Sequence, residues 1–235
     1  MVEVPPSPHR TPLAAIIIDD CGNNDIPIPT LLSAPAPITL AILPHLAFSR
    51  QIAIAAHERG KGVMLHFPME PVSNVNPGPG TLRLKMSDAE KLQIIKDNLS
   101  SVPDIQGVNN HEGSLLTTDP HTMTMVLEAV KACGLFFIDS VTTPDSCLPD
   151  VARQVRLPFA RRDVFLDDDP SIEAVKEQMR LLIRVALLHG QAIGIGHARM
   201  NTATAFVEMI PAFEEAGVKL VLARDLTRVP GMLRP

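Results

Sequence analysis

Short runs of apolar and β-branched residues recur along the chain, and most are followed by a segment with the apolar spacing of an amphipathic helix. The runs that predict strands cover residues 14–19, 38–43, 62–67, 105–110, 135–139, 157–166, 191–196 and 218–222. Strands that alternate with helices are typical of βαβ units, whose strands lie parallel in one sheet. The pattern therefore predicts a parallel sheet covered by helices.

Boundary residues support the helical segments between these runs. Ser87 and Glu90 form a capping box before one helix, Asp119 begins a second that Gly134 ends, and Gly190 ends the longest. Seven or eight mostly parallel strands in one domain predict an α/β fold, a distorted (β/α) barrel, with a doubly wound open sheet as the main alternative. The chain has neither a GxGxxG nor a GxxxxGK[ST] motif, so a nucleotide site is not indicated.

Length and composition favour one soluble domain. The chain has 235 residues, of which 46% are hydrophobic and 20% charged, and no apolar run reaches the length of a membrane span. We expect a single barrel domain over residues 13–235. Residues 1–12 are proline-rich and polar, as in a linker or a trimmed chain end. No signal peptide is visible there, and an upstream anchor would be compatible with this start.

Charge and cysteine content exclude two further classes. The net charge is −5 with a pI near 5.9, and no cluster of Lys and Arg offers the footprint that a nucleic acid requires. The three cysteines have no metal-type spacing and do not describe a disulfide framework. The sequence gives no indication of the oligomeric state.

Polar residues able to do chemistry follow nearly every predicted strand. They are Asp19, Asp20, His45, His66, Asn109, Asn110, His111, Asp139, Ser140, Asp163, His197, Arg224 and Asp225. In a barrel the carboxyl ends of the strands share one rim, so these residues are predicted to converge.

An Asp and two His at three strand ends are the ligands of a metal site that leaves one position open for water. Zn²⁺ or another divalent ion there would offset the carboxylate charge and lower the pKa of that water. Adjacent strand residues point to opposite faces, so Asp19 and Asp20 reach one site only if the pleat breaks, which Gly22 would ease. One Asp would bind the metal while the other accepts a proton.

Seven sequence strings in this order resemble the divergent polysaccharide deacetylase family of bacteria, over roughly residues 13 to 227. They are "IIIDDCG", "TLAILP", "MLHFPMEP", "GVNNHEGSLLTTD", "FFIDSVT", "RRDVFLD" and "AIGIGHA". The resemblance implies a distorted barrel of the polysaccharide deacetylase superfamily, an exported, periplasmic or cell-envelope location, and metal-dependent removal of acetyl groups. It also implies that Asp19 is the base, Asp20 a metal ligand and His197 the acid.

The metal histidines depart from the superfamily, which takes both from one His-x-x-x-His or His-x-x-x-Asn turn. This chain has "HFPME", which offers His66 but places Glu70 at the second position. His111 is the replacement that we expect. If Glu70 is the third ligand instead, His111 would face the substrate or support another ligand.

Further residues are expected around this centre. Arg162 and Asp163 are predicted to form an ion pair in which Asp163 positions a histidine. Candidates for contact with substrate are Asn110, Asp139, Glu70 and His45.

The sequence thus predicts a metal-dependent hydrolase that removes N- or O-linked acetyl groups from a carbohydrate or cell-wall glycan. The alternative is a non-catalytic envelope protein that binds glycan or a cell-wall partner through a retained metal pocket. The chain has no Trp and no Tyr to stack on sugar rings. A short glycan or a peptidoglycan fragment therefore suits it better than a long polysaccharide.

Overall fold

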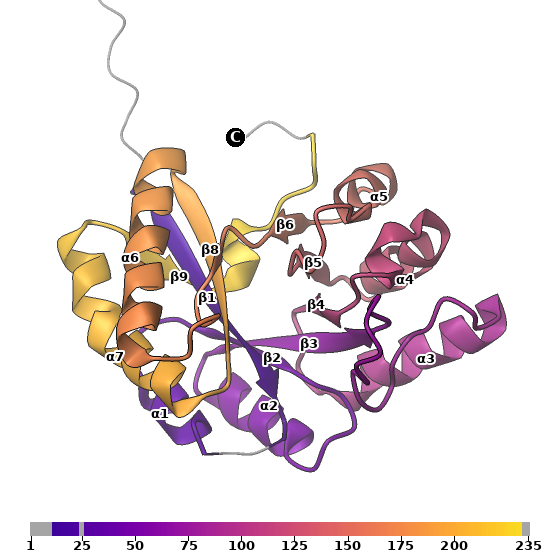
Figure 1. Ribbon diagram of the computed structural model, residues 1–235, viewed down its shortest axis with the longest axis horizontal. Helices are drawn as coiled ribbons and strands as arrows, with labels where there is room; N and C mark the ends of the chain where they lie inside the picture. Colours follow the sequence, from indigo (N-terminus) through magenta and orange to yellow (C-terminus); the bar gives the residue numbers. More distant parts are fainter. Residues whose placement is uncertain (1–10, 24–25, 232–235) are drawn as a thin grey trace, which may run out of the picture.

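Parallel strands form one curved sheet in the computed structural model, which describes residues 11–23 and 26–231 (Figure 1). The strands are β1 (Leu13–Cys21), β2 (Thr39–Ile42), β3 (Gly62–Met69), β4 (Gly107–Glu112), β5 (Phe136–Asp139), β6 (Phe159–Arg161), β7 (Val164–Phe165), β8 (Gln191–His197) and β9 (Lys219–Val221). The helices are α1 (Ile28–Ser33), α2 (Ser49–Glu58), α3 (Asp88–Ser101), α4 (Pro120–Ala132), α5 (Leu148–Val155), α6 (Ile172–His189) and α7 (Met200–Glu215), with short 3₁₀ turns at Leu116–Thr118 and Ala223–Leu226. Most of segment 1–12 lies outside the described residues.

The strand order is β6-β5-β4-β3-β2-β1-β8-β7, and β9 pairs with β1. All strand pairings in this sheet are parallel. The predicted strand 157–166 is instead two short strands, of which β6 pairs with β5 and β7 pairs with β8. Only Arg162 and Asp163 join them, so this connection closes the distorted barrel between the two ends of the sheet.

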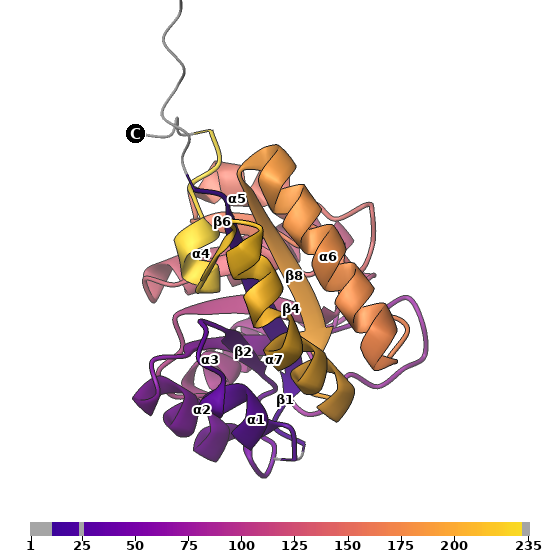
Figure 2. The same cartoon turned by 90° about the vertical axis from the view of Figure 1, so that its left-hand side faces the viewer.

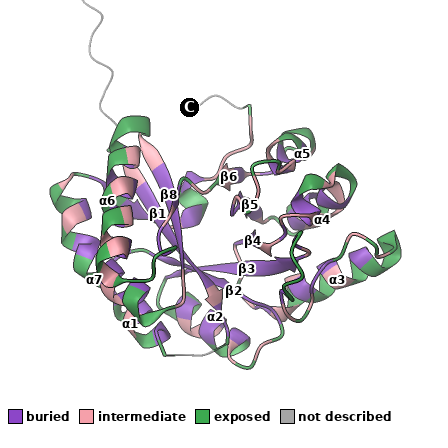
Figure 3. Ribbon diagram, in the orientation of Figure 1, coloured by how far each residue is buried: buried purple, intermediate pink, exposed green. Residues whose placement is uncertain are grey.

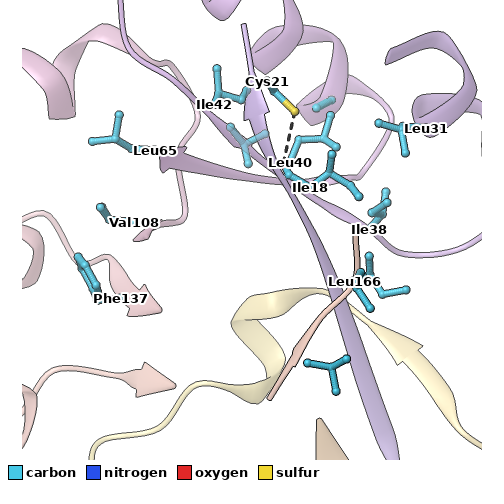
Figure 4. Close-up of a cluster of buried hydrophobic side chains, with 14 of the residues drawn as sticks. Ile18, Cys21, Leu31, Ile38, Leu40, Ile42, Leu65, Val108, Phe137 and Leu166 are labelled. Carbon is cyan, nitrogen blue, oxygen red and sulfur yellow. Dashed lines mark hydrogen bonds between the residues drawn. The ribbon is translucent and has the colours of Figure 1, made fainter. Parts of the chain in front are cut away.

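Alternate residues of each strand enter two different cores. Ala15, Ile17, Met64, Ile138 and Ile195 belong to the smaller core inside the barrel. The opposite faces of the strands pack on the helices in the larger core, part of which Figure 4 shows around Ile18, Leu40 and Ile42. Asp19 therefore continues the inward-facing row of β1. The strands are almost wholly buried, and exposed residues follow the outer faces of the helices (Figure 3).

The helices form an arc around the outside of the strands (Figure 1). Helices α6 and α7 pack against each other, and α6 also contacts β8 (Figure 2). The capping box is present, since the Ser87 side chain accepts from the Glu90 N–H and the Glu90 side chain accepts from the Ser87 N–H. Asp119 caps α4 through its side chain, which accepts from the Thr122 N–H at 2.8 Å. Among the described residues, no helix combines the length and the apolar character that crossing a membrane requires.

Candidate metal centre and active site

The pleat of β1 breaks where the two carboxylates lie. The pairing of β1 with β2 shifts register between Ile18 and Cys21, and Asp20 has a φ of +59°. The break that we expected is thus present, with Asp20 itself in the left-handed region and Gly22 following at +128°. An aspartate at positive φ is tolerated at a modest cost in free energy. This turn lets Asp20 reach the same cavity as Asp19.

Asp20, His66 and His111 bring three potential ligand atoms together from β1, β3 and β4. Oδ1 of Asp20 lies 3.3 Å from Nε2 of His66 and 3.1 Å from Nδ1 of His111. Those two ring nitrogens lie 3.1 Å apart. Ligand bonds of 2.0–2.2 Å at tetrahedral angles would separate ligand atoms by about 3.3–3.6 Å, slightly more than these distances. The three side chains therefore fit one divalent ion such as Zn²⁺.

The charge of Asp20 also suits this side chain to bind a metal ion. Its Oδ1 is buried and accepts no hydrogen bond among the described residues. Burial opposes ionisation, but the neighbouring His111 and His66 outweigh it and hold the pKa of Asp20 well below its usual range. Asp20 is thus an ionised carboxylate that lies beside two imidazoles. A carboxylate has to be ionised to bind a metal.

Asp19 is nearly inaccessible beside this cluster, with 3% of its surface exposed. Its Oδ1 accepts a hydrogen bond of 2.8 Å from Nδ2 of Asn109, and its Oδ2 lies 3.6 Å from Nε2 of His66. Burial raises the pKa of Asp19, and His66 and Asn109 counteract it in part. A carboxylate whose pKa is raised toward neutral pH can accept and return a proton.

His197 lies across the cavity and is held by Asp167. Its Nδ1 is 2.8 Å from Oδ1 of Asp167, whose Oδ2 accepts from the His197 backbone N–H at 2.8 Å and from the Thr202 hydroxyl at 2.8 Å. Burial lowers the pKa of His197, but Asp167 outweighs it, and the net shift is upward. Nε2 of His197 lies 3.9 Å from Oδ2 of Asp20 and is the ring nitrogen left for proton transfer.

The cavity that joins these groups has a volume of about 490 Å³. Phe165 lies in its wall between His197, whose ring centre is 5.5 Å away, and Arg162, whose guanidinium lies 5.1 Å from the Phe165 ring. Asn110, Ser140 and Arg199 also line this cavity. The Asn110 carboxamide accepts from the Ser140 N–H and donates to the Glu112 carbonyl, so it mainly fixes the rim.

Backbone strain gathers on this rim as well. Glu112 is the last residue of β4 and Val141 follows β5, and their φ values are +53° and +56°. Both line the cavity with Asp20. A β-branched residue at positive φ is an outlier, and such outliers cluster at functional sites.

Glu70 and His45 do not line this cavity. The Glu70 carboxylate accepts from the Leu84 N–H at 2.7 Å and lies 3.8 Å from Arg83, so it fastens a loop. Nε2 of His45 lies 2.8 Å from Oδ1 of Asn98 in a separate surface hollow. The structure thus groups His111, and not Glu70, with Asp20.

The carboxylates of Asp139 and Asp163 also accept hydrogen bonds from the backbone. The expectation that Asp163 positions a histidine is wrong, because its Oδ2 accepts from the Ile193 N–H at 2.7 Å and Asp167 holds His197 instead. No ion pair joins Asp163 to Arg162 in the described chain. Fully buried Asp139 accepts from the Val141 N–H and lies 3.5 Å from Arg161, away from the cavity.

Comparison with known proteins places these residues in a family. A protein of Haemophilus influenzae described as uncharacterized is 36% identical over 80% of the chain, and the uncharacterized protein YibQ of Escherichia coli is 33% identical over 87%. The chain spans 67% and 64% of the lengths of these two relatives, about two thirds in each case.

Solved structures share the fold. The uncharacterized protein ATU2773 of Agrobacterium tumefaciens superposes with a TM-score of 0.88 at 22% identity, over 94% of this chain and 91% of that one. A mutant described as a CE4 family pseudoenzyme with restored enzymatic activity superposes with a TM-score of 0.56 at 15% identity, over 94% of this chain and 68% of that one.

Residues 16–227 match the sequence profile described as divergent polysaccharide deacetylase. The chain belongs to the divergent polysaccharide deacetylase family.

Proposed function

We propose that this chain is a metal-dependent hydrolase that removes N- or O-linked acetyl groups from a carbohydrate or cell-wall glycan. The observation that carries the proposal is the convergence of Asp20, His66 and His111 between buried Asp19 on one side and His197 on the other. The family supports the glycan as substrate and the exported or envelope location. A peptidoglycan fragment is the partner that we favour.

Asp20, His66 and His111 would hold the divalent cation, for which we propose Zn²⁺. When bound, the cation supplies a Lewis acid that activates water and stabilises negative charge on the acetyl oxygen. Asp19 accepts the proton of the attacking water, for which its raised pKa and its place beside His66 suit it. His197 donates a proton from Nε2 to the departing amine or alkoxide, and Asp167 keeps its ring protonated and oriented.

Acetate release tests this proposal directly. Protein freed of metal with a chelator and reloaded with Zn²⁺, Mn²⁺, Co²⁺ or Ni²⁺ is incubated with N-acetylglucosamine oligomers or peptidoglycan fragments. We expect release that depends on metal and falls at least about 100-fold in Asp19→Asn, because general base catalysis contributes ~10²–10⁴-fold. The exposed Asp168→Asn is the matched control.

The alternative function predicts a different result. If the loaded protein binds these glycans and releases no acetate, the chain is a binding protein that uses its metal pocket for recognition. If turnover is found and Asp19→Asn does not reduce it, the assignment of the base is wrong.

A further inference from the structure

Arg162 is a partly buried cation that is fixed from two sides. Its Nε donates to the carbonyl of Ser140 at 2.8 Å, and its Nη2 donates to the carbonyl of Val141 at 3.1 Å. The guanidinium also lies over the ring of Phe165, 5.1 Å from its centre. Two carbonyls and one ring therefore hold the planar group in a single orientation, at little further entropic cost for a ligand.

These two hydrogen bonds use one edge of the guanidinium. Nε and the Nη2 N–H next to it form the side edge, which the two carbonyls occupy. The end edge, formed by Nη1 and the second N–H of Nη2, makes no hydrogen bond within the described chain. Two parallel N–H groups at that edge match the two oxygens of a carboxylate or a phosphate.

Arg162 also has no carboxylate in direct contact among the described residues. No Asp or Glu oxygen of the described residues lies within 4.0 Å of it, whereas its neighbour Arg161 pairs with Asp139 at 3.5 Å. Arg199 on the same cavity wall lies 3.7 Å from Asp167. Asp139, Asp19 and Asp163 act on the charge of Arg162 only from beyond contact distance. The two carbonyls that Arg162 binds are neutral, so an anionic ligand would bring the first negatively charged oxygen into direct contact with this half-buried guanidinium.

Arg162 lies in the candidate active site. Arg162 lines the same cavity as Asp20 and His197, and Phe165 contacts both Arg162 and His197. Glu112 also lines this cavity but makes no ion pair with Arg162. A substrate whose acetyl group reaches Asp20 and His197 therefore passes along this cation.

We propose that Arg162 binds an oxyanion of the substrate, so that the preferred substrate is an acidic acetylated sugar with a carboxylate or phosphate near the acetyl group. The identification of this ligand as a substrate rests on the proposed function, whereas the binding of an oxyanion at Arg162 does not depend on turnover. The absence of Trp and Tyr agrees with recognition through charge instead of stacking on a neutral sugar face.

The test compares ligands that differ only in charge. Zn²⁺-loaded protein is titrated by NMR with N-acetylmuramic acid and its methyl ester, and separately with N-acetylglucosamine 6-phosphate and N-acetylglucosamine. We expect at least one anion to bind about 10- to 100-fold more tightly than its neutral counterpart, as a charge-assisted bidentate contact would give. The pair that shows the difference identifies the oxyanion as carboxylate or phosphate.

Variants assign the effect to Arg162. Arg162→Gln should reduce the ratio of the two affinities, anion to neutral counterpart, to about one. Arg162→Lys should keep part of the preference, since a lysine retains the charge but not the two parallel N–H groups. Arg161→Gln removes the same charge one residue away, outside this cavity, and should keep the full preference. Thermal melting of each variant checks that the turn at Ser140 and Val141 is still folded.

Two results would overturn the inference. One is that neither anion binds more tightly than its neutral counterpart, and the other is that the preference survives in Arg162→Gln. Acetate release from the same ligands separates the two proposals. Release without an anion preference supports the deacetylase and rejects this site, whereas an Arg162-dependent preference without release does the opposite.

Discussion

Oδ1 of Asn109 lies 2.9 Å from Nδ1 of His66, and this contact sets the tautomer of the ring. The carboxamide cannot be reversed, because its Nδ2 donates to Asp19 at 2.8 Å and lies 3.2 Å from the Ser140 hydroxyl. Oδ1 of Asn109 therefore accepts from Nδ1–H of His66. In the neutral ring, Nε2 of His66 is then the unprotonated nitrogen and faces Asp20, so one fully buried amide orients both the candidate base and a candidate ligand.

Replacing Asn109 should weaken metal binding although Asn109 touches no metal. In Asn109→Ala the His66 ring is free to exchange tautomers, and we expect the Zn²⁺ affinity to fall by about 10- to 100-fold. Competition with a chromophoric chelator measures this. Asn201→Ala removes an exposed asparagine that donates to a carbonyl and serves as the control. A Zn²⁺ affinity that stays within about twofold in Asn109→Ala would show that the amide does not orient His66.

The alternation of β4 could have identified Asn109 from the sequence. Residues two apart on a strand face the same side, so an inward His111 implies an inward Asn109. In the sheet, His66 and Asn109 are direct register partners, which no single-sequence pattern specifies. The strand end was thus predictable, but the pairing that gives Asn109 its role required the fold.

The third metal ligand can be decided between His111 and Glu70. We expect His111→Ala to lower the Zn²⁺ affinity by more than about 100-fold, because loss of a ligand exceeds the effect of losing a supporting residue. Glu70→Ala should leave the affinity unchanged and lower the free energy of unfolding by about 1 kcal/mol, through the unpaired Leu84 N–H.

The exposed His121→Ala controls for removal of a histidine, since His121 lies away from the cavity and pairs with Asp88 on the surface. Calorimetric Zn²⁺ titrations and urea unfolding would give both quantities for all three variants. If Glu70→Ala lost the metal and His111→Ala kept it, the ligand set drawn from the geometry would be wrong.

The parallel barrel and its functional rim followed from periodicity and from the rule that strand carboxyl ends share one face. The segment 157–166 was beyond this rule, because one apolar run there forms two strands that pair at opposite ends of the sheet. The aspartate that holds His197 is therefore Asp167, which follows β7, and not Asp163. The available signal was a break in the run at Arg161, Arg162 and Asp163, three consecutive charged residues inside an apolar stretch.

Asp167 should set the pH range of activity through His197. His197 acts as an acid, so turnover is lost as the pH rises through its pKa, and the carboxylate of Asp167 raises that pKa against the effect of burial. Asp167→Asn removes the charge, so the basic limb of the plot of kcat/KM against pH should move to lower pH. The exposed Asp168→Asn should leave that limb in place.

An NMR titration of His197 in both variants gives the same direction without turnover. If the His197 titration shifts in Asp167→Asn while the basic limb stays in place, another group is the acid. If neither moves, Asp167 does not raise the pKa of His197.

The positive φ of Asp20 should appear as a difference in stability between two variants that both lack its carboxylate. At a φ of +59° alanine is strained and glycine is not, so Asp20→Gly should have a free energy of unfolding about 1 kcal/mol higher than Asp20→Ala. Urea unfolding in the presence of a chelator removes any contribution from metal. Exposed Asp104 also has a φ of +59°, and the same two substitutions there give the reference difference. Equal stabilities at position 20 beside a clear difference at position 104 would mean that β1 relaxes once the carboxylate is gone. The bent strand end would then be maintained by the attraction of Asp20 to His66 and His111, and not by the backbone alone.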